Sequence, residues 1–327
     1  HYPYFRSFVG KVSNVNLDYE GIADCLITQE GLIHPLGVKR KFSDGGKKLI
    51  FPQGRVRGVF TYPELRLLEE SGRGRILKVY RGYAWKERST PFRKFVLAFY
   101  EKRNKTQEFS VFYKYLLNSL YGKFGQDPET EEVELKKDGK LIRKESPNFV
   151  ESNPVVSAYI TAYGRIHLWR HFQKIGEENV YYCDTDSIHS PKTISGLGKE
   201  IGMLKLEDEG EALYVRSKCY VMNDMVKWKG LPMKVKADYV KGLIETGNFQ
   251  ILEEILVKSV YAFRLHIPYL SYIKRWKVFN LSEDGKRKYK KHLMGKRLLS
   301  DFTSSYPIKL RDPENLEEVV KYGRLVD

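Results

Sequence analysis

Residues 181–187, YYCDTDS, place two carboxylates, Asp184 and Asp186, one residue apart in a strand-forming stretch. The strand pattern breaks at Asp-Thr-Asp and resumes at Ile188, which predicts a tight β-hairpin with both acids near its tip. Two carboxylates this close repel each other unless a cation lies between them, and hard oxygen ligands of this kind suit Mg²⁺. The stretch therefore predicts a metal site. An ordinary solvated turn is the alternative, because Asp and Thr are common turn residues.

The composition is that of a basic globular chain. Of its 327 residues, 42% are hydrophobic, but no segment approaches the roughly 18 uninterrupted apolar residues of a membrane span, which argues against a membrane role. Fifty-seven Lys and Arg against 41 Asp and Glu leave a formal charge of +16, which favours a polyanionic partner, nucleic acid first. A basic surface without a specialised role is the alternative. Cys25, Cys183 and Cys219 are too scattered for a disulfide framework or a zinc site, and no signal-peptide pattern is present, so we expect a reducing, intracellular setting.

Residues 1–90 predict the framework of a sheet, because short β-prone runs alternate there with glycines. The runs are 23–28, 49–51, 55–61 and 76–83. Between them, Pro63 to Glu70 predicts a short helix that begins at the proline. We assign Asp18-Tyr19-Glu20 to a turn without function, because a lone Asp-x-Glu is common.

From residue 91 the apolar period changes from two to 3.6, which predicts two successive helices. We expect the second helix to bury Phe109, Phe112, Leu116 and Leu120. Its other face aligns Lys114, Asn118, Tyr121 and Gly125. A cation, an amide, an aromatic ring and a glycine in one row suit an incoming nucleotide, since the ammonium can meet phosphate and the ring can meet base and sugar. The alternative is that the polar members merely face solvent and that Tyr121 caps the core.

Residues 126–153 predict an inserted β-arm, in which 132–135 face 141–143 across an Asp-Gly turn. A long helix is expected next, over residues 155–174, leading to the acidic hairpin. Beyond the hairpin, residues 201–207 and 212–222 are predicted to be strands.

The region from Gly247 onward is predicted to be helical and to carry a concentrated positive charge. Between Arg264 and Arg297 there are 11 Lys or Arg and two acids, interleaved with aromatic residues such as Tyr272 and Trp276. Cations alternating with rings suit a sugar-phosphate backbone. A solvated face is the alternative, which the clustering disfavours.

Four motifs in this order resemble those of the family B DNA polymerases, most closely the protein-primed branch of bacteriophages and linear plasmids. Residues 182–187 resemble that family's palm hairpin, and KYLLNSLYG at 114–122 resembles its fingers motif, Lys-x-x-x-Asn-Ser-x-Tyr-Gly. TAYGR at 161–165 is similar to the template-contacting Thr-x-x-Gly-Arg, and KCY at 218–220 to the Lys-x-Tyr beside the primer end. The resemblance covers essentially the whole chain and is weakest from residue 247.

The resemblance implies an α+β fold of the right-hand polymerase type, with an antiparallel palm sheet and its helices, helical fingers and a small thumb. The implied palm comprises residues 1–90 and 154–246, with the catalytic hairpin at 180–190. The implied fingers are residues 91–125, and the thumb is 247–327. The arm at 126–153 lies where protein-primed members carry an insertion linked to strand displacement and processivity.

The resemblance also implies a DNA-directed DNA polymerase, which adds deoxynucleotides to a primer 3′-hydroxyl with two Mg²⁺ ions, Mn²⁺ being able to substitute. Asp186 would be the principal metal ligand present and Asp184 an auxiliary one. The nucleotide site would comprise Lys114, Asn118, Tyr121, Gly122, Lys102 and Tyr2, with Tyr2 under the deoxyribose. DNA would be held by Thr161, Gly164, Arg165, Lys218 and Tyr220. The implied partners are primer-template DNA, deoxynucleoside triphosphates and a terminal priming protein, in the host cytoplasm or an organelle.

One motif departs from the family pattern. The first catalytic motif, Asp-x-x-Ser-x-Tyr-Pro, is matched only by its tail at His1-Tyr2-Pro3-Tyr4, and its Asp is a metal ligand. We therefore expect little or no activity from these 327 residues alone, and no proofreading within them. Two other functions stay open: a catalytically incomplete DNA-binding fragment, and a metal-dependent nucleotide-sugar transferase, which also uses Asp-x-Asp but needs neither the basic region nor the Lys114 helix.

Overall fold

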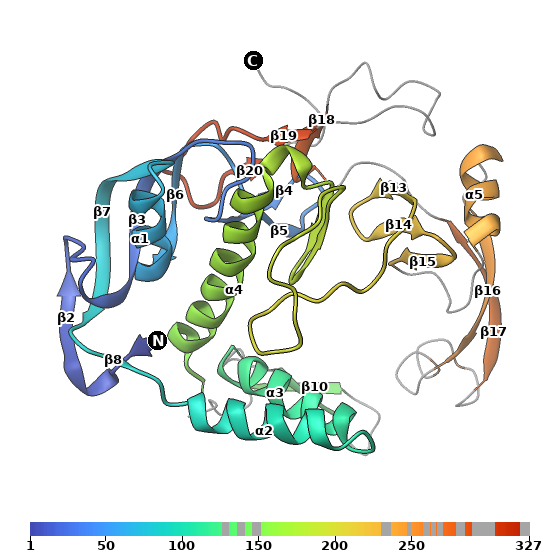
Figure 1. The fold of residues 1–327 in the computed structure, drawn as a ribbon, viewed down its shortest axis with the longest axis horizontal. Coiled ribbons are helices and arrows are strands. Elements are labelled where there is room, and N and C mark those ends of the chain that lie inside the picture. The colour runs from blue at the N-terminus through green and yellow to red at the C-terminus, as the bar shows by residue number, and fades with distance from the viewer. Residues whose placement is uncertain are drawn as a thin grey trace. The chain divides into compact units, whose positions relative to one another are not determined.

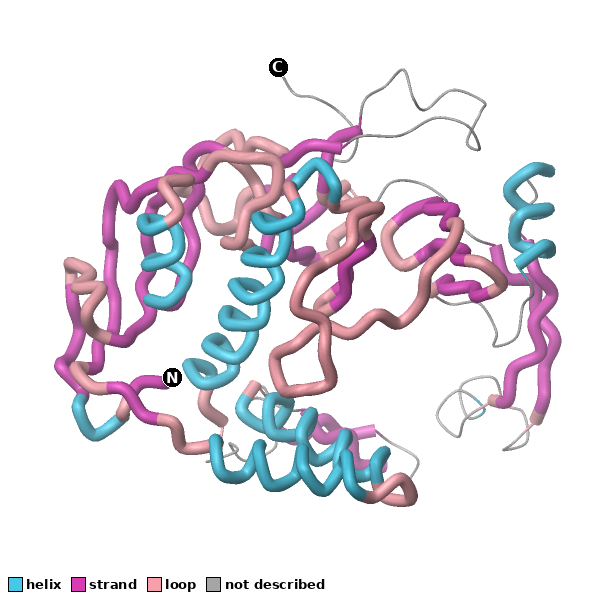
Figure 2. Tube along the Cα trace, in the orientation of Figure 1, coloured by secondary structure: helices cyan, strands magenta, loops and turns pink. Residues whose placement is uncertain are grey.

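The computed structural model describes residues 1–125, 131–135, 141–145, 152–229, 237–246, 250–257, 262, 266, 271–278, 285–289 and 305–320. The chain divides into two compact units, and residues 206–306 of the second interrupt the first along the chain. The first unit is His1–Lys205 with Pro307–Lys321, and the second is Leu206–Tyr306 with Tyr322–Asp327. Helices and strands occur in both (Figures 1 and 2), which confirms a mixed α+β chain.

The first unit is built on a four-stranded antiparallel sheet in the order β2-β7-β3-β6. Its strands are β2 (Phe8–Val12), β7 (Gly74–Trp85), β3 (Glu20–Gln29) and β6 (Gly54–Thr61). Most of β3 is buried, because helix α1 (Tyr62–Glu70) packs against the sheet (Figure 1). The helix begins with a capping box in which Thr61 and Glu64 satisfy each other's backbone amides. The strands and the short helix predicted within residues 23–83 are confirmed.

Smaller strand pairs complete the first unit. β4 (Val38–Phe42) pairs with β5 (Lys47–Ile50) on one side and in parallel with β20 (Val319–Val320) on the other. The C-terminal segment thus returns to the first unit, where the amide of Gln53 donates to the carbonyl of Ile308 at 3.0 Å. Near the N-terminus, β1 (Tyr2–Pro3) pairs with β8 (Arg88–Ser89).

Helices α2 (Arg93–Lys105) and α3 (Ser110–Phe124) lie side by side, as Figure 2 shows, and confirm the two predicted helices. The Phe99 ring lies 5.9 Å from the Tyr113 ring across their interface. The predicted buried face of α3 is wrong in part, since Phe109 and Phe112 are 51% and 57% exposed. Phe112 and Tyr113 are adjacent, and either could lie on the apolar face of a helix. Tyr113 is the one that faces α2, so Phe112 is left exposed.

Helix α4 (Pro154–Ile175) follows the predicted arm and confirms the long helix expected there. Asn153 caps its start by accepting from the amide of Val156. In the arm, β9 (Glu131–Leu135) and β10 (Leu141–Glu145) form the predicted antiparallel pair, while the Asp-Gly turn lies outside the described residues. After α4, a 3₁₀ turn, η2 (Glu177–Asn179), leads to β11 (Tyr182–Asp184) and β12 (Ser187–His189).

The described part of the second unit begins with a three-stranded antiparallel sheet, β13 (Ala212–Arg216), β14 (Cys219–Met222) and β15 (Met225–Trp228). The single strand predicted over 212–222 is therefore a hairpin, because the chain turns at Ser217-Lys218 with Lys218 at φ 59°. The strand predicted over 201–207 is also wrong. That stretch forms no strand and exposes Ile201, Met203 and Leu206.

The remainder of the second unit contains α5 (Ala237–Thr246), the antiparallel pair β16 (Gln250–Leu256) and β17 (Tyr272–Val278), and the pair β18 (Arg287–Tyr289) and β19 (Ser305–Pro307). The helical prediction from residue 247 is thus wrong for the described residues that form these strands. Tyr272, Lys274 and Trp276 recur every second residue and are all exposed. The alternation of cations and rings therefore follows the two-residue period of a strand. Among the described residues, none of the helices has the length and apolar character needed to cross a membrane.

Candidate functional site

The Asp-Thr-Asp stretch forms a hairpin with a strained tip. Asp184 pairs with Ser187 at the end of the ladder, and the amide of Asp186 donates back to the carbonyl of Asp184 at 2.6 Å. Thr185, at the centre of this three-residue turn, has φ 57°, a conformation that a β-branched residue rarely adopts. The predicted hairpin is confirmed. Its backbone strain is an additional sign of a functional position, because strained conformations persist where the surrounding structure enforces them.

The hairpin is fixed to the first unit by apolar contacts at its base. Val180 and Ile188 pack against a buried cluster formed by Leu67, Ile166, Leu168, Trp169 and Phe172. Burial lowers the pKa of His189, whose ring meets the Tyr182 ring edge-on at 5.2 Å. The acids at the tip therefore extend from a rigid base into more exposed surroundings.

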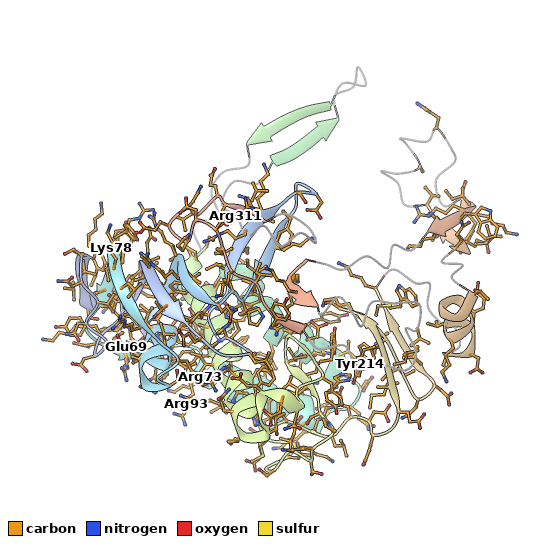
Figure 3. The ribbon with its side chains drawn as sticks, turned by 90° about the horizontal axis from the view of Figure 1, so that it is seen from above. Glu69, Arg73, Lys78, Arg93, Tyr214 and Arg311 are labelled. Atoms are coloured by element: carbon orange, nitrogen blue, oxygen red, sulfur yellow. The ribbon has the colours of Figure 1, made fainter. Side chains whose placement is uncertain are left out.

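Glu177, in the turn between α4 and the hairpin, adds a polar anchor to this base. Its Oε2 accepts from the amides of Leu32 and Ile33 at 3.0 and 3.2 Å. Its Oε1 accepts from Gln173 at 2.6 Å and lies 3.3 Å from the guanidinium of Arg73, which is labelled in Figure 3. Nothing in the sequence signalled this role, because Arg73 and the 32–33 loop are distant along the chain.

Asp184 and Asp186 are the residues of this site that suit a divalent cation. Carboxylate oxygens are the ligands that Mg²⁺ prefers, Asp186 is exposed, and Asp184 is partly exposed. Within the described ranges, no group of three or more His, Cys, Asp or Glu side chains is arranged to hold a metal ion. The hairpin thus supplies two hard ligands, and a complete two-ion site needs a further one.

The face of α3 that carries the predicted nucleotide-binding residues, called the α3 stripe below, is exposed along its length. Lys114, Asn118, Tyr121 and Gly122 all lie on the surface, and a Cβ at Gly122 would meet no atom within 4 Å. On α2, Lys102 is exposed and its Nζ lies 5.4 Å from the centre of the Phe99 ring. These positions leave the side chains accessible to a ligand.

Gly125, the last member of the predicted row, lies against the start of α4. A Cβ at this position would lie 2.7 Å from the Oγ of Ser157, at the start of α4. The glycine therefore allows the end of α3 to approach α4.

Tyr2 is linked to α2 and α3 through aromatic contacts. Its ring meets Phe92 edge-on at 5.4 Å, and Phe92 lies 5.0 Å from Phe124, near the end of the α3 stripe. Its other neighbour is Tyr159 of α4, at 6.2 Å. Burial raises the pKa of Tyr2. The structure thus links Tyr2, through Phe92, to Phe124 at the end of α3.

Tyr159, the other neighbour of Tyr2, contacts Glu20, part of the Asp18-Tyr19-Glu20 stretch that is predicted to be a turn without function. Asp18 is in a turn, but Glu20 is the first residue of β3, and its side chain is fully buried. Its Oε1 lies 2.7 Å from Arg66 and 2.6 Å from Arg88, and its Oε2 accepts from the Tyr159 hydroxyl at 2.8 Å. Burial, and then the Glu20 charge, raise the pKa of Tyr159, so this hydroxyl stays protonated as a donor.

Thr161 and Arg165, predicted to contact DNA, line one groove of about 230 Å³ between α4 and β6. Arg165 donates to Oε1 of the buried Glu64 at 2.7 Å. Thr161 donates to the carbonyl of Ala158 in its own helix at 2.9 Å. Gly164 is exposed, and a Cβ there would meet nothing within 4 Å. The Arg165 guanidinium thus forms an ion pair inside the protein, which the sequence pattern does not predict.

Lys218 and Tyr220 lie in the second unit, in one hairpin. Lys218 occupies the exposed turn, and the Tyr220 ring lies 5.8 Å from that of Tyr214, which is labelled in Figure 3. The carbonyl of Lys218 accepts from the amide of Lys229 at 2.8 Å, which fixes the turn against the end of the neighbouring strand.

Comparison with known proteins gives matches for most of the chain. Residues 1–195 match the family model described as DNA polymerase type B, organellar and viral. A probable DNA polymerase of Ascobolus immersus is 28% identical over 266 residues, covering 72% of this chain and 22% of that protein. The DNA polymerase of Bacillus phage Nf is 29% identical over 216 residues, covering 61% of this chain and 37% of that protein.

A solved structure of Phi29 DNA polymerase, complexed with primer-template DNA, has a similar fold. Its TM-score is 0.57 at 19% identity, and the match covers 84% of this chain and 53% of that one. The chain thus spans less than two fifths of the length of these two curated relatives and about half of that of the solved structure.

Proposed function

Because the chain belongs to the family B DNA polymerases of the organellar and viral, protein-primed type, we propose that it forms the polymerising part of a DNA-directed DNA polymerase. The substrate would be a primer 3′-hydroxyl on a DNA template, extended with deoxynucleoside triphosphates. The observation that carries the proposal is the strained hairpin that presents Asp184 and Asp186 within the matched residues.

The two acids would hold Mg²⁺, which stabilises the entering and leaving oxygens of nucleotidyl transfer when it is bound. Asp186, in the turn itself, is the more exposed and is assigned as the principal ligand; Asp184 is assigned as the auxiliary one. A carboxylate from the family's first motif, absent from these 327 residues, would complete the set. Mn²⁺ suits the same oxygen ligands and can replace Mg²⁺.

The incoming nucleotide would lie along the exposed face of α3. Lys114 would neutralise the triphosphate with help from Lys102, because an ammonium is a compact partner for phosphate. Asn118, Tyr121 and Gly122 would shape the pocket for base and sugar. Tyr2, held beside the end of α3 by Phe92 and Phe124, would lie under the deoxyribose and exclude a 2′-hydroxyl.

The DNA contacts would come from both units. Thr161, Gly164 and Arg165 are assigned to the template, and Lys218 and Tyr220 to the primer end. The exposed cations and rings of β17 suit the duplex backbone. The palm, fingers, arm and thumb boundaries given above and the terminal priming protein are part of this proposal. A host cytoplasm or an organelle is the setting it implies.

Primer extension tests the assignment. We expect a chain that carries an Asp-x-x-Ser segment ahead of His1 to extend a recessed primer with Mg²⁺, and the 327 residues alone to do so barely or not at all. Asp186→Asn should abolish extension, and Asp184→Asn should be equally or less damaging. Full activity of Asp186→Asn would show that the metal site is misassigned.

A catalytically incomplete DNA-binding fragment is the second candidate, since the hairpin itself supplies two carboxylates, Asp184 and Asp186. Tight binding of primer-template DNA with no extension, even when the first motif is present, would favour it. A nucleotide-sugar transferase remains the least supported alternative, and failure to bind primer-template DNA would favour it.

A further inference from the structure

Four elements of the first unit meet at the carboxylate of Glu20. The acid begins β3, Arg66 comes from α1, Arg88 from β8 and Tyr159 from α4. All three partners lie within 2.8 Å of a Glu20 oxygen, and the Glu20 side chain has no exposed surface. A charge buried this completely is strongly destabilising when one partner is removed, so the carboxylate holds its partners in fixed positions.

Two of these partners act directly on the surroundings of Tyr2. Arg88 lies in β8, which pairs with β1 so that Pro3 faces Arg88 and Tyr2 faces Ser89. Tyr159 places its ring 6.2 Å from the Tyr2 ring while its hydroxyl contacts Glu20. The same hydroxyl accepts from the amide of Gly21 at 2.6 Å. Tyr2 is therefore fixed both through its own strand pair and through the ring that it packs against, and both contacts lead back to Glu20.

We propose that Glu20 is a positioning residue that sets the location of Tyr2 and thereby the discrimination between deoxyribose and ribose, although Glu20 itself touches no substrate. This inference rests on the proposed function, in which Tyr2 lies under the sugar. A steric filter depends on the position of the ring to a fraction of an ångström, because a 2′-hydroxyl adds only one oxygen atom. If β1 were held less firmly, the Tyr2 ring could move and the site would accept a nucleotide with a 2′-hydroxyl.

A second buried ion pair on the same strand provides a matched control. Asp24 is 4% exposed and is bound by the Nε and NH2 of Arg57 at 3.0 and 2.8 Å. It belongs to β3 like Glu20, and its partner is on β6. Substitution of either acid should lower the folding stability, whereas only substitution of Glu20 should change the position of Tyr2.

The test compares Glu20→Gln, Tyr159→Phe and Arg88→Lys with Asp24→Asn. Tyr159→Phe is the mildest, because it keeps the ring beside Tyr2 and removes only the hydroxyl, and it serves if Glu20→Gln fails to fold. The first readout is hydrogen exchange of the Tyr4 amide, which donates to the carbonyl of Glu87 at 2.9 Å beside the β1–β8 pair. The second is the ratio of dissociation constants for a ribonucleoside and a deoxyribonucleoside triphosphate, measured with Mg²⁺ on the primer-template complex.

We expect the Glu20 and Tyr159 variants to accelerate exchange at Tyr4 and to lower the preference for the deoxy form about tenfold, since small misplacements of positioning groups cost this much or more. Arg88→Lys, which keeps the positive charge, should retain most of the protection of the Tyr4 amide and most of the preference for the deoxy form. Asp24→Asn should change neither the exchange at Tyr4 nor this preference. An unchanged preference in Tyr159→Phe and Glu20→Gln, or an equal change in Asp24→Asn, would overturn the inference. If the wild type binds no nucleotide, the proposed function fails, and the exchange data still decide whether Glu20 holds β1.

Discussion

Substitution of Arg165 should reduce folding stability as well as DNA binding. Its guanidinium contacts Oε1 of Glu64, whose side chain is 4% exposed, while the Arg165 side chain is 28% exposed. In Arg165→Ala the Glu64 carboxylate keeps the amide and hydroxyl of Thr61 on Oε2, at 3.0 and 2.8 Å. On Oε1 it loses the Arg165 guanidinium, so a buried negative charge becomes partly uncompensated.

The magnitude follows from this geometry. Removing one partner of a fully buried ion pair costs about 3 to 5 kcal/mol, and exposure of Arg165 reduces that figure through solvent screening. We therefore expect Arg165→Ala to lower the free energy of unfolding of the first unit by about 2 kcal/mol. Glu64→Gln should remove the charge that Arg165 compensates. The double variant should then be more stable than the sum of the single effects predicts, by about 1 kcal/mol.

Urea unfolding monitored by tryptophan fluorescence measures this cycle. Trp169, whose indole donates to the carbonyl of Ile33 at 3.1 Å, reports on α4 beside Arg165. DNA affinity should be compared at urea-free conditions where every variant is folded. A loss below about 0.5 kcal/mol in Arg165→Ala, the size of an ordinary surface substitution, together with strict additivity, would refute the internal role and leave Arg165 as a DNA contact alone.

Three further outcomes are expected. Lys114→Ala should weaken the apparent affinity for deoxynucleotides roughly ten- to hundredfold with little change in DNA affinity. As a control, replacement of the exposed Lys94 by Ala should change neither the nucleotide affinity nor the DNA affinity. Equal losses of nucleotide and DNA affinity in Lys114→Ala would contradict the assignment of Lys114 to the triphosphate. Replacing Lys274 and Lys277 of β17 by Gln should flatten the slope of log K for DNA against log salt by about two units, and an unchanged slope would place the DNA elsewhere. Burial raises the pKa of Tyr62 from 10.0 to about 12. Its stabilising contribution is therefore present below pH 10 and is lost as pH rises toward 12, and Tyr62→Phe should reduce the decline in unfolding free energy over that window by about 2 to 3 kcal/mol.

The features that sequence predicted well are local in the chain. The Asp-Thr-Asp hairpin, α1 with its proline start and α4 depend on periods and turn residues that lie within a few positions of one another. The pair β16–β17 differs from the helix predicted there, because the alternation of cations and rings along 272–276 also has the two-residue period of a strand.

The Glu20 network could not be predicted from spacing. Its partners Arg66 and Tyr159 lie 46 and 139 residues away along the chain, and no local pattern distinguishes a buried acid at the start of a strand from one in a turn. The same holds for Arg165, which a motif assigns to DNA while its partner Glu64 is 101 residues distant.

The return of the C-terminal segment to the first unit has a practical consequence for dissecting the protein. Tyr80 donates to Glu314 at 2.6 Å, Arg57 donates to the carbonyl of the same residue at 3.0 Å, and β20 extends β4. A deletion series that shortens the chain from its end would remove these contacts from the first unit before it reached residues 206–306, the larger part of the second unit. Loss of DNA binding in such a series would then be misattributed to the second unit. Its contribution is better isolated by excising residues 206–306 and bridging the gap with a flexible linker, which keeps the returning strand in place.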